Sequence, residues 1–205
     1  KAFHYSNLGY GLLGAVLERV TGKPWIELLA EQVLAPLSML RTTYHPHEPF
    51  APGYVVHPLH GTLNEEPRTD TGAMAPAGQL WSTLADLGRW AAFLAEPAPE
   101  VLAPETLAEM CVPVAISDPE TWSGGHGLGL ELYRRGERVL VGHGGSMPGY
   151  VSVIAVHRPS RTGIVAYANA YGFPIGQLGF AALLEVLDRE PAPPAPWRPA
   201  APPPP

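Results

Sequence analysis

The last third of the chain constrains the fold most, because it contains four strand-length segments rich in β-branched and aromatic residues. Glycine, proline or charged residues separate each segment from the next, as is typical of turns between strands. The segments are Leu128–Arg135, Arg138–His143, Tyr150–Val156 and Gly163–Asn169. A helical pattern over Phe173–Arg189 follows them. We therefore predict an α+β fold, in which an antiparallel sheet from Leu128 to Asn169 is backed by the C-terminal helix.

The earlier part of the chain is predicted to be mostly helical and to form the other side of a cleft. Helical patterns cover Ser6–Val20, a second stretch from Pro24 to Pro36, a third from the Thr83 and Asp86 capping box to Pro97, and a shorter one from Pro104. Between the second and third patterns, the segment Arg41–Ala77 is rich in Pro, Gly, His and Thr and has no sustained period. Irregular segments of this length are usually functional or disordered, so this one is a candidate wall or lid over a cleft.

Composition excludes several classes of function. The chain has 205 residues, of which 46% are hydrophobic and 16% charged, which describes a packed globular protein. Its net charge of -6, without any basic run, argues against nucleic acid or an anionic membrane as a partner. No apolar stretch is long enough to cross a bilayer. The single cysteine, Cys111, has no partner for an internal disulfide, so the redox compartment and the localisation stay undetermined.

The two ends of the sequence suggest where the domain stops. Residues 191–205 are almost wholly Pro and Ala, which predicts an extended linker or tail after a domain covering residues 1–190. The sequence begins at Lys1 without an initiator Met or a signal peptide, so we expect the natural N-terminus to lie upstream.

Two short motifs carry residues suited to catalysis. Tyr5, Ser6 and Asn7 directly precede the first predicted helix, where a side chain can point into a cleft while the helix holds it in place. His143, Gly144, Gly145 and Ser146 lie at the end of a predicted strand, where glycines let a substrate lie against the backbone and a free N–H can face an oxyanion. Taken singly, each motif has an ordinary structural explanation, namely a helix cap with a packed tyrosine and a tight hairpin turn with a surface histidine.

Taken together, the motifs resemble those of the serine β-lactamase and penicillin-binding-protein family, which includes class C β-lactamases, D-amino-acid peptidases and related esterases. The matching stretches are Tyr5–Gly14, Ala77–Thr83 and Gly142–Tyr150, in the family's order and spacing. The resemblance implies a β-lactamase/transpeptidase-like fold and acyl transfer by a serine that attacks an ester, peptide or β-lactam carbonyl. It implies no metal and no organic cofactor.

The resemblance also implies roles for individual residues. Tyr5 matches the tyrosine that shuttles protons, and Asn7 matches the residue that binds the substrate's amide side chain. His143 stands where β-lactamases carry lysine, and a partly charged histidine binds a carboxylate less reliably, which favours an esterase or peptidase. Ser146 would supply one N–H of the oxyanion hole beside Gly144 and Gly145. We expect Tyr5 and Asn7 on one wall to face His143 and Ser146 on an edge strand.

The family's nucleophile motif, Ser-x-x-Lys, does not occur in the sequence. The only lysines are Lys1 and Lys23, and neither follows a serine by three residues. We therefore expect the C-terminal part of a serine hydrolase, inactive on its own, with the nucleophile upstream.

Three alternatives stay open at this point. An α/β-hydrolase would need Gly-x-Ser-x-Gly, which the sequence lacks. A zinc site could be built from the imidazoles of the irregular segment and one carboxylate, namely His45, His47, His57, His60 and Glu48. A non-catalytic module on the same fold could bind peptides or cell-wall fragments without any serine nucleophile.

Overall fold

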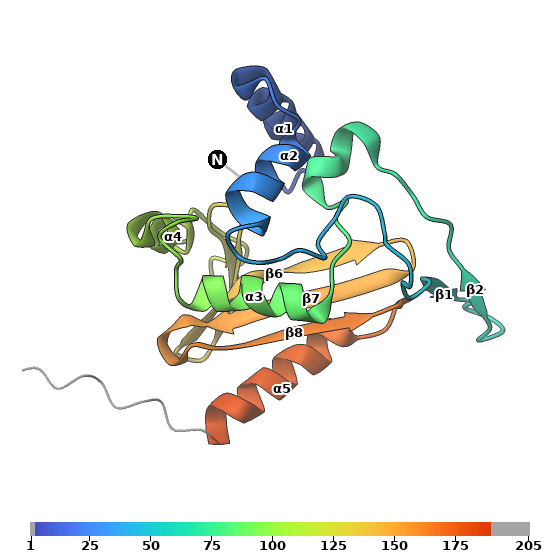
Figure 1. Ribbon diagram of the computed structural model, residues 1–205. Coiled ribbons are helices and arrows are strands. Elements are labelled where there is room, and N and C mark those ends of the chain that lie inside the picture. The colour runs from blue at the N-terminus through green and yellow to red at the C-terminus, as the bar shows by residue number, and fades with distance from the viewer. Residues whose placement is uncertain (1–2, 190–205) are drawn as a thin grey trace, which may run out of the picture.

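The structure is a computed structural model, which describes residues 3–189 (Figure 1). The N-terminal half contains α1 (Asn7–Thr21), α2 (Trp25–Leu29), the π-helical turn η1 (Ala30–Leu34), β1 (Tyr54–Val56), β2 (Leu63–Glu65), the 3-10 turn η2 (Gly72–Ala77) and α3 (Leu84–Ala95). The C-terminal half contains α4 (Pro104–Met110), β3 (Ala115–Ile116), β4 (Gly124–His126), β5 (Glu131–Arg135), β6 (Arg138–Met147), β7 (Tyr150–His157), the 3-10 turn η3 (Arg158–Ser160), β8 (Thr162–Ala168), β9 (Ala170–Tyr171) and α5 (Ile175–Arg189). The predicted tail over 191–205 lies outside the described residues.

A six-stranded antiparallel sheet forms the centre of the molecule, with its strands in the order β3-β4-β5-β6-β7-β8. A second, three-stranded sheet pairs β1 with β2 in antiparallel and with β9 in parallel orientation. The α+β class and the antiparallel meander predicted from the sequence are confirmed. The large sheet extends further than predicted, because β3 and β4 precede the four expected strands.

Two helices cover opposite faces of the large sheet, and side-chain alternation along its strands separates two cores. On one face, Phe93 and Leu94 of α3 pack with Val141 of β6. On the other face, Leu183 of α5 packs with Leu140, the neighbouring residue of the same strand. In Figure 1, α3 lies in front of the strands and α5 lies below β8, while α1 and α2 lie above the sheet. The predicted C-terminal helix therefore backs the sheet as expected.

The predicted helix starts are confirmed by their caps. Ser6 is the N-cap of α1, and its hydroxyl accepts the Gly9 N–H at 3.0 Å. Thr83 caps α3 by accepting the Asp86 N–H at 3.2 Å. The Asp86 carboxylate does not complete the capping box, because it accepts instead from the Arg41 N–H and the Thr42 hydroxyl. Asp86 thus ties the start of the irregular segment to α3.

Candidate functional site

The site is organised by β6, which is longer than its neighbour β5. The last pair between these strands joins Glu131 to Gly142, whereas β6 continues along β7 as far as the pair Met147 and Tyr150. His143 to Met147 therefore have a strand on one side only. Our expectation of an edge strand needs correction: β6 lies inside the sheet, and only its second half is an edge.

The motif from His143 to Ser146 is not a turn. All four residues belong to β6, and the turn falls at Pro148 and Gly149. The explanation of this motif as a tight hairpin turn is therefore wrong. The β6–β7 pairing extends the strand through the two glycines, although their lack of side chains gave no strand signal.

Tyr5 and His143 lie together in the structure. Their ring centroids are 6.1 Å apart, with the ring planes inclined by 44°. Tyr5 precedes the N-cap of α1, and His143 follows the last β6 residue paired with β5. Two residues 138 positions apart in sequence thus border the same stretch of free strand edge, on the face of the sheet that also carries Val141.

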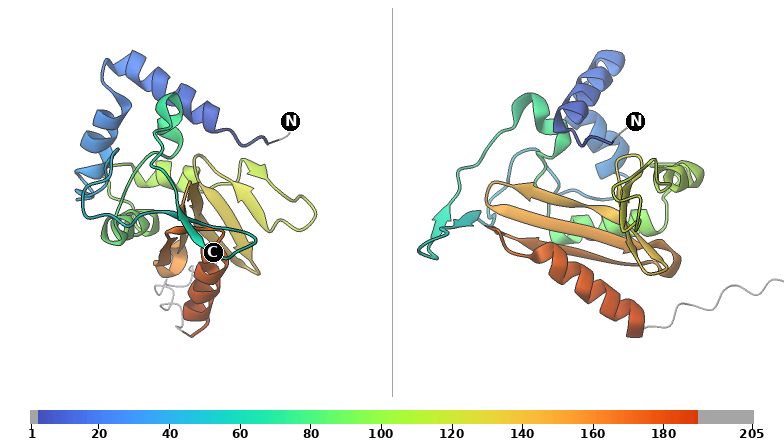
Figure 2. Two further views of the ribbon diagram at one scale, coloured as in Figure 1. Left: turned by 90° about the vertical axis from the view of Figure 1, so that its right-hand side faces the viewer. Right: turned by 180° about the vertical axis from the view of Figure 1, so that it is seen from behind.

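The docking of α1 fixes the position of Tyr5. Two glycines of α1, Gly11 and Gly14, lie against η2. A β-carbon at Gly11 would lie 2.7 Å from the Ala73 carbonyl oxygen, and a β-carbon at Gly14 would lie 2.3 Å from the Pro76 ring. Phe3 also stacks on His126 with ring centroids 3.8 Å apart. Figure 2 shows the blue start of the chain above the yellow strands in both views. His126 lies in β4.

Asn7 is exposed at the first position of α1. Ser6 is the N-cap, so the alternative explanation of Asn7 as the cap is wrong. Among residues 3–189, no side-chain hydrogen bond joins Asn7 to His143 or Ser146. The structure thus brings Tyr5 and His143 together, but within residues 3–189 it shows no hydrogen bond from the Asn7 side chain to the site.

Three backbone groups on the free edge of β6 matter for the site, namely the N–H and the carbonyl of Gly144 and the N–H of Ser146. The Gly144 N–H donates to Oε2 of Glu131 at 3.1 Å, and the Gly144 carbonyl accepts from Nδ1 of His143. Backbone groups alternate in direction along a strand, so the Ser146 N–H points to the same side as that of Gly144. Within the described part of the chain, no side chain bonds to this N–H, which leaves it free for a ligand oxygen.

The hydrogen bond of His143 also defines its neutral tautomer. A carbonyl oxygen can only accept, so Nδ1 carries the proton and Nε2 is left as the acceptor in the neutral ring. The Nδ1 hydrogen bond therefore holds the imidazole to the backbone of its own strand, and Nε2 does not take part in this bond.

Glu131 is the residue that the sequence analysis missed. It begins β5 opposite Gly142, and its Oε2 accepts from both the Gly144 N–H and the Tyr133 hydroxyl. Among residues 3–189, Oε1 has no hydrogen-bond partner. A glutamate at the start of a strand gives no signal by itself, since its position beside His143 depends on the register between β5 and β6.

The electrostatics around Tyr5 favour its neutral form. Partial burial, and then the negative charge of Glu131 and the nearby Tyr10, raise the pKa of Tyr5 above its ordinary value. Burial and the hydrogen bond to Glu131 raise the pKa of Tyr133 as well. Both phenols are therefore protonated at neutral pH, unless a cation comes close to Tyr5, and Tyr133 donates its proton to Glu131.

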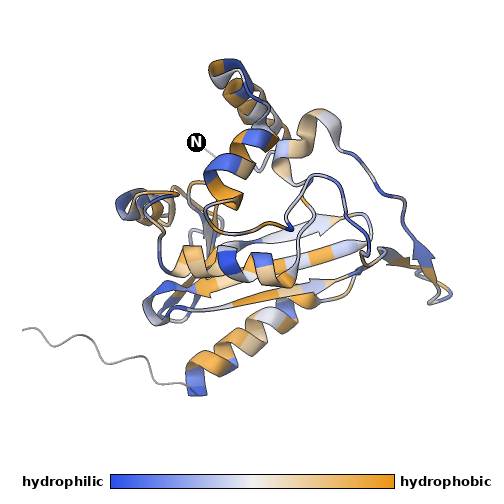
Figure 3. Ribbon diagram, viewed as in Figure 1, coloured by the Kyte–Doolittle hydropathy of each residue, from blue (hydrophilic) through white to orange (hydrophobic). Residues whose placement is uncertain are grey.

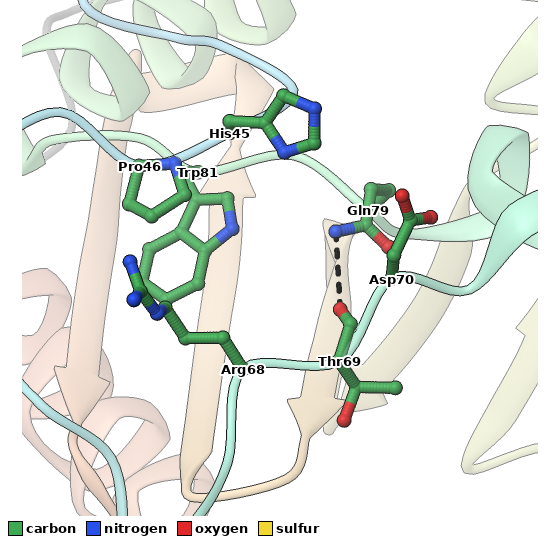
Figure 4. Close-up of a pocket in the computed structure, with 7 residues that line it drawn as sticks. All are labelled: His45, Pro46, Arg68, Thr69, Asp70, Gln79 and Trp81. Atoms are coloured by element: carbon green, nitrogen blue, oxygen red, sulfur yellow. Dashed lines mark hydrogen bonds between the residues drawn. The ribbon is translucent and has the colours of Figure 1, made fainter.

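A separate hollow of about 360 Å³ lies in the irregular segment (Figure 4). It is lined by His45, Pro46, Arg68, Thr69, Asp70, Gln79 and Trp81. Two of its polar side chains are hydrogen-bonded within the loop: the buried Gln79 accepts from Thr71 and donates to the Thr69 carbonyl, and Asp70 accepts from Tyr44. These hydrogen bonds stabilise the loop. Neither Tyr5 nor His143 lines the hollow.

The histidines of the irregular segment do not form a metal site. Nδ1 of His57 accepts the N–H groups of Leu59 and His60, at 3.2 and 3.3 Å, and so closes a local turn. Over residues 3–189, no three His, Cys, Asp or Glu side chains come together as ligands. Within the same residues, no helix is both long and apolar enough to span a membrane.

Comparison with known proteins gives one family. The family model described as Beta-lactamase matches residues 1–188. Beta-lactamase-like protein 2 of Dictyostelium discoideum is 27% identical over 190 residues, which cover 90% of this chain and 34% of that protein. The chain therefore spans about a third of the length of this curated relative.

Two solved structures share both the fold and recognisable sequence. A D-stereospecific amidohydrolase from Streptomyces sp. has a TM-score of 0.78 and 26% identity, over 89% of this chain and 54% of that chain. The D-amino acid amidase of Ochrobactrum anthropi SV3, in complex with L-phenylalanine amide, has a TM-score of 0.74 and 26% identity, over 91% of this chain and 57% of that chain. These similarities confirm the predicted fold.

Proposed function

Because this chain belongs to the beta-lactamase family, we propose that it supplies one half of the acyl-transfer site of a serine hydrolase that cleaves amide or ester bonds. The observation that carries the proposal is the position of Tyr5, with its ring centroid 6.1 Å from that of His143, beside the free edge of β6. A substrate carbonyl at this edge would meet a backbone donor, a phenol and an imidazole at once.

The free edge would bind the substrate backbone and its carbonyl oxygen. The Ser146 N–H would donate to the oxyanion that forms when a serine attacks the carbonyl carbon. Gly144 and Gly145 carry no side chain that would hold the substrate away from the strand. The attacking serine would come from a Ser-x-x-Lys segment outside the 205 residues, because none occurs within them.

Tyr5 would handle the proton. In acyl transfer, a base takes the proton from the serine hydroxyl as the new C–O bond forms, and an acid returns it to the leaving group as the old bond breaks. Burial and Glu131 raise the pKa of Tyr5, so this chain alone favours the phenol. The lysine of Ser-x-x-Lys and a protonated His143 would stabilise the phenolate.

The relatives favour an amide substrate over a β-lactam. Two of the structural neighbours are named as a D-stereospecific amidohydrolase and a D-amino acid amidase. His143 also replaces the permanent cation that binds the carboxylate of a β-lactam. We therefore place amides and esters of amino acids ahead of penicillins as substrates.

A binding module is the second candidate function. It is favoured by the protonated state of Tyr5 and by the lack of Ser-x-x-Lys in the 205 residues. Such a module would hold an amide at the same free edge without cleaving it.

Trapping of the acyl-enzyme separates the two functions. The chain would be expressed together with the polypeptide encoded upstream of Lys1 and mixed with D-phenylalanine methyl ester. The reaction would be quenched in acid, and the intact mass of the protein would be measured by mass spectrometry. We expect a gain of one D-phenylalanyl group, which disappears when the serine of the upstream Ser-x-x-Lys is replaced by alanine. An upstream region without that motif, or an extended protein that forms no adduct, would leave the binding module.

A further inference from the structure

We propose that Glu131 selects the substrate, by binding an ammonium group next to the reactive carbonyl and by repelling carboxylates. This inference rests on the proposed function for the position of the carbonyl and adds the charge of the substrate to it. The proposal concerns a residue that no sequence motif marked.

The position of Glu131 is the first support. Its carboxylate lies at the first residue of β5, where the free edge of β6 begins, and it accepts the first outward N–H of that edge, that of Gly144. The next outward N–H belongs to Ser146. Two residues of a strand cover roughly 6.6–7 Å, so the carboxylate marks one end of a site of about that length, with the Ser146 N–H at the other end.

The unused oxygen of Glu131 is the second support. A carboxylate has about four acceptor positions, and Oε2 already receives the Tyr133 hydroxyl and the Gly144 N–H. Within residues 3–189, Oε1 receives no hydrogen bond, which leaves it for a ligand. The two bonds on Oε2 hold the carboxylate in place, so a ligand would find it already oriented.

The charges around the edge are the third support. The nearby arginines of β5 are engaged elsewhere: Arg134 donates to the Gly136 carbonyl, and Arg135 donates to the Ser123 carbonyl and lies over the Phe180 ring. Lys23 pairs with Glu31. Among the charged groups of residues 3–189, Glu131 is thus the one bonded to the free edge, beside the imidazole of His143.

These distances fit an N-terminal amino acid. With its carbonyl oxygen at the Ser146 N–H, an aminoacyl amide or ester would direct its α-ammonium back along the strand toward Oε1 of Glu131. A substrate with a carboxylate in that position would face a like charge and the loss of its own hydration. The structure therefore favours substrates with a free amino terminus over acylated or anionic ones.

Binding to the 205-residue chain tests the inference without any catalysis. Titration calorimetry at pH 6.5 would compare D-phenylalaninamide, which is mainly protonated at that pH, with neutral N-acetyl-D-phenylalaninamide and with anionic N-succinyl-D-phenylalaninamide, which carries its carboxylate on the amino side. We expect the cation to bind about tenfold more tightly than the neutral amide, as is usual for a charge-assisted hydrogen bond, and the anion to bind most weakly.

Two variants assign the preference to Glu131. Glu131→Gln should abolish the difference between the cation and the neutral amide while keeping the shape of the side chain. Glu137→Gln removes the same charge from the turn at the far end of β5 and should keep the preference. Thermal unfolding of both variants would check that they fold. Retention of the preference in Glu131→Gln, an anion that binds as well as the cation, or the absence of any binding would overturn the inference.

The result of this binding test is independent of the result of the acyl-enzyme test of the proposed function. A cation preference that depends on Glu131, together with an extended protein that forms no acyl-enzyme, would support the inference and refute the hydrolase. An acyl-enzyme without any charge preference would do the reverse.

Discussion

At the scale of single residues, the site combines groups whose charges oppose one another. Tyr5 would need a low pKa to act as a base, yet the carboxylate of Glu131 stabilises its neutral phenol. The same carboxylate holds the Gly144 N–H and so defines where the free edge of β6 begins. Glu131 therefore links the electrostatics of the site to its geometry.

The ionisation of Tyr5 should respond to Glu131. Burial raises the pKa of Tyr5 most, and the Glu131 carboxylate raises it further, so Glu131→Gln should lower it, whereas Glu137→Gln should leave it unchanged. Titration of chain labelled with ¹³C-tyrosine, followed by NMR from pH 7 to 12 and assigned with Tyr5→Phe, would measure this pKa. A Tyr5 that ionises below 10 in the unaltered chain would contradict the account of its surroundings.

At the scale of elements, the contact between α1 and η2 positions Tyr5. The contact depends on glycine, because a β-carbon at Gly14 would overlap the Pro76 ring, which has no rotamer that moves it away. A β-carbon at Gly9, in the same helix, would lie 3.6 Å from Ser6, which is an ordinary contact.

These two glycines give a matched pair of variants. Gly14→Ala should lower the free energy of unfolding by roughly 1–3 kcal/mol through overpacking. Gly9→Ala should leave it unchanged or raise it by up to about 1 kcal/mol, because alanine favours the helix. Urea unfolding followed by circular dichroism would measure both. Equal stability of the two variants would show that α1 does not pack on η2 as described.

The loop between β3 and β4 should make stability depend on pH in acid. Asp118 accepts hydrogen bonds from the Ser123 hydroxyl at 2.6 Å, from the Ser123 N–H and from the Gly124 N–H, and these bonds lower the pKa of its carboxyl. Its contribution is therefore present above its ordinary pKa near 3.8 and is lost as the pH falls through its pKa in the folded state.

Asp118→Asn isolates that contribution, because asparagine does not titrate. The variant should be less stable than the parent at pH 7, and the difference in melting temperature should shrink as the pH falls below 4. Calorimetric scans from pH 2 to 7 would measure it. A constant difference over that range would mean that the carboxylate does not hold this loop.

Local sequence signals predicted most elements but not their partners. The caps at Ser6 and Thr83 and the alternation over β7 and β8 were sufficient to predict those helices and strands. By contrast, β4 consists of Gly124, Gly125 and His126, which have no strand propensity and form a strand only by pairing with β3 and β5. The continuation of β6 through its glycines was missed for the same reason.

At the scale of the whole molecule, the apolar surface is unevenly covered. Buried clusters lie on both faces of the large sheet, whereas α1 buries Gly11 and Gly14 and exposes its large apolar side chains. Figure 3 shows the apolar stretches of α1 in orange. The exposed residues of α1 are Leu8, Tyr10, Leu12, Leu13, Val16, Leu17 and Val20. Helical periodicity predicted the helix and its apolar face, but a period alone does not reveal what that face contacts.

The site also belongs to this larger scale. Tyr5 and His143 were predicted to meet through resemblance to a family, and the fold brings them together across most of the chain. Glu131 could not be predicted in this way, because it joins the site only through the register of β5 on β6.

The measurement that tests the central claim most directly is the effect of Tyr5→Phe on hydrolysis. The chain, extended by the polypeptide encoded upstream of Lys1, would be assayed for kcat/KM on D-phenylalanine p-nitroanilide with and without this substitution. If Tyr5 transfers the proton at the free edge of β6, kcat/KM should fall by roughly 10²–10⁴-fold, while the melting temperature stays the same. A Tyr5→Phe variant that hydrolyses the substrate as fast as the parent would contradict the account.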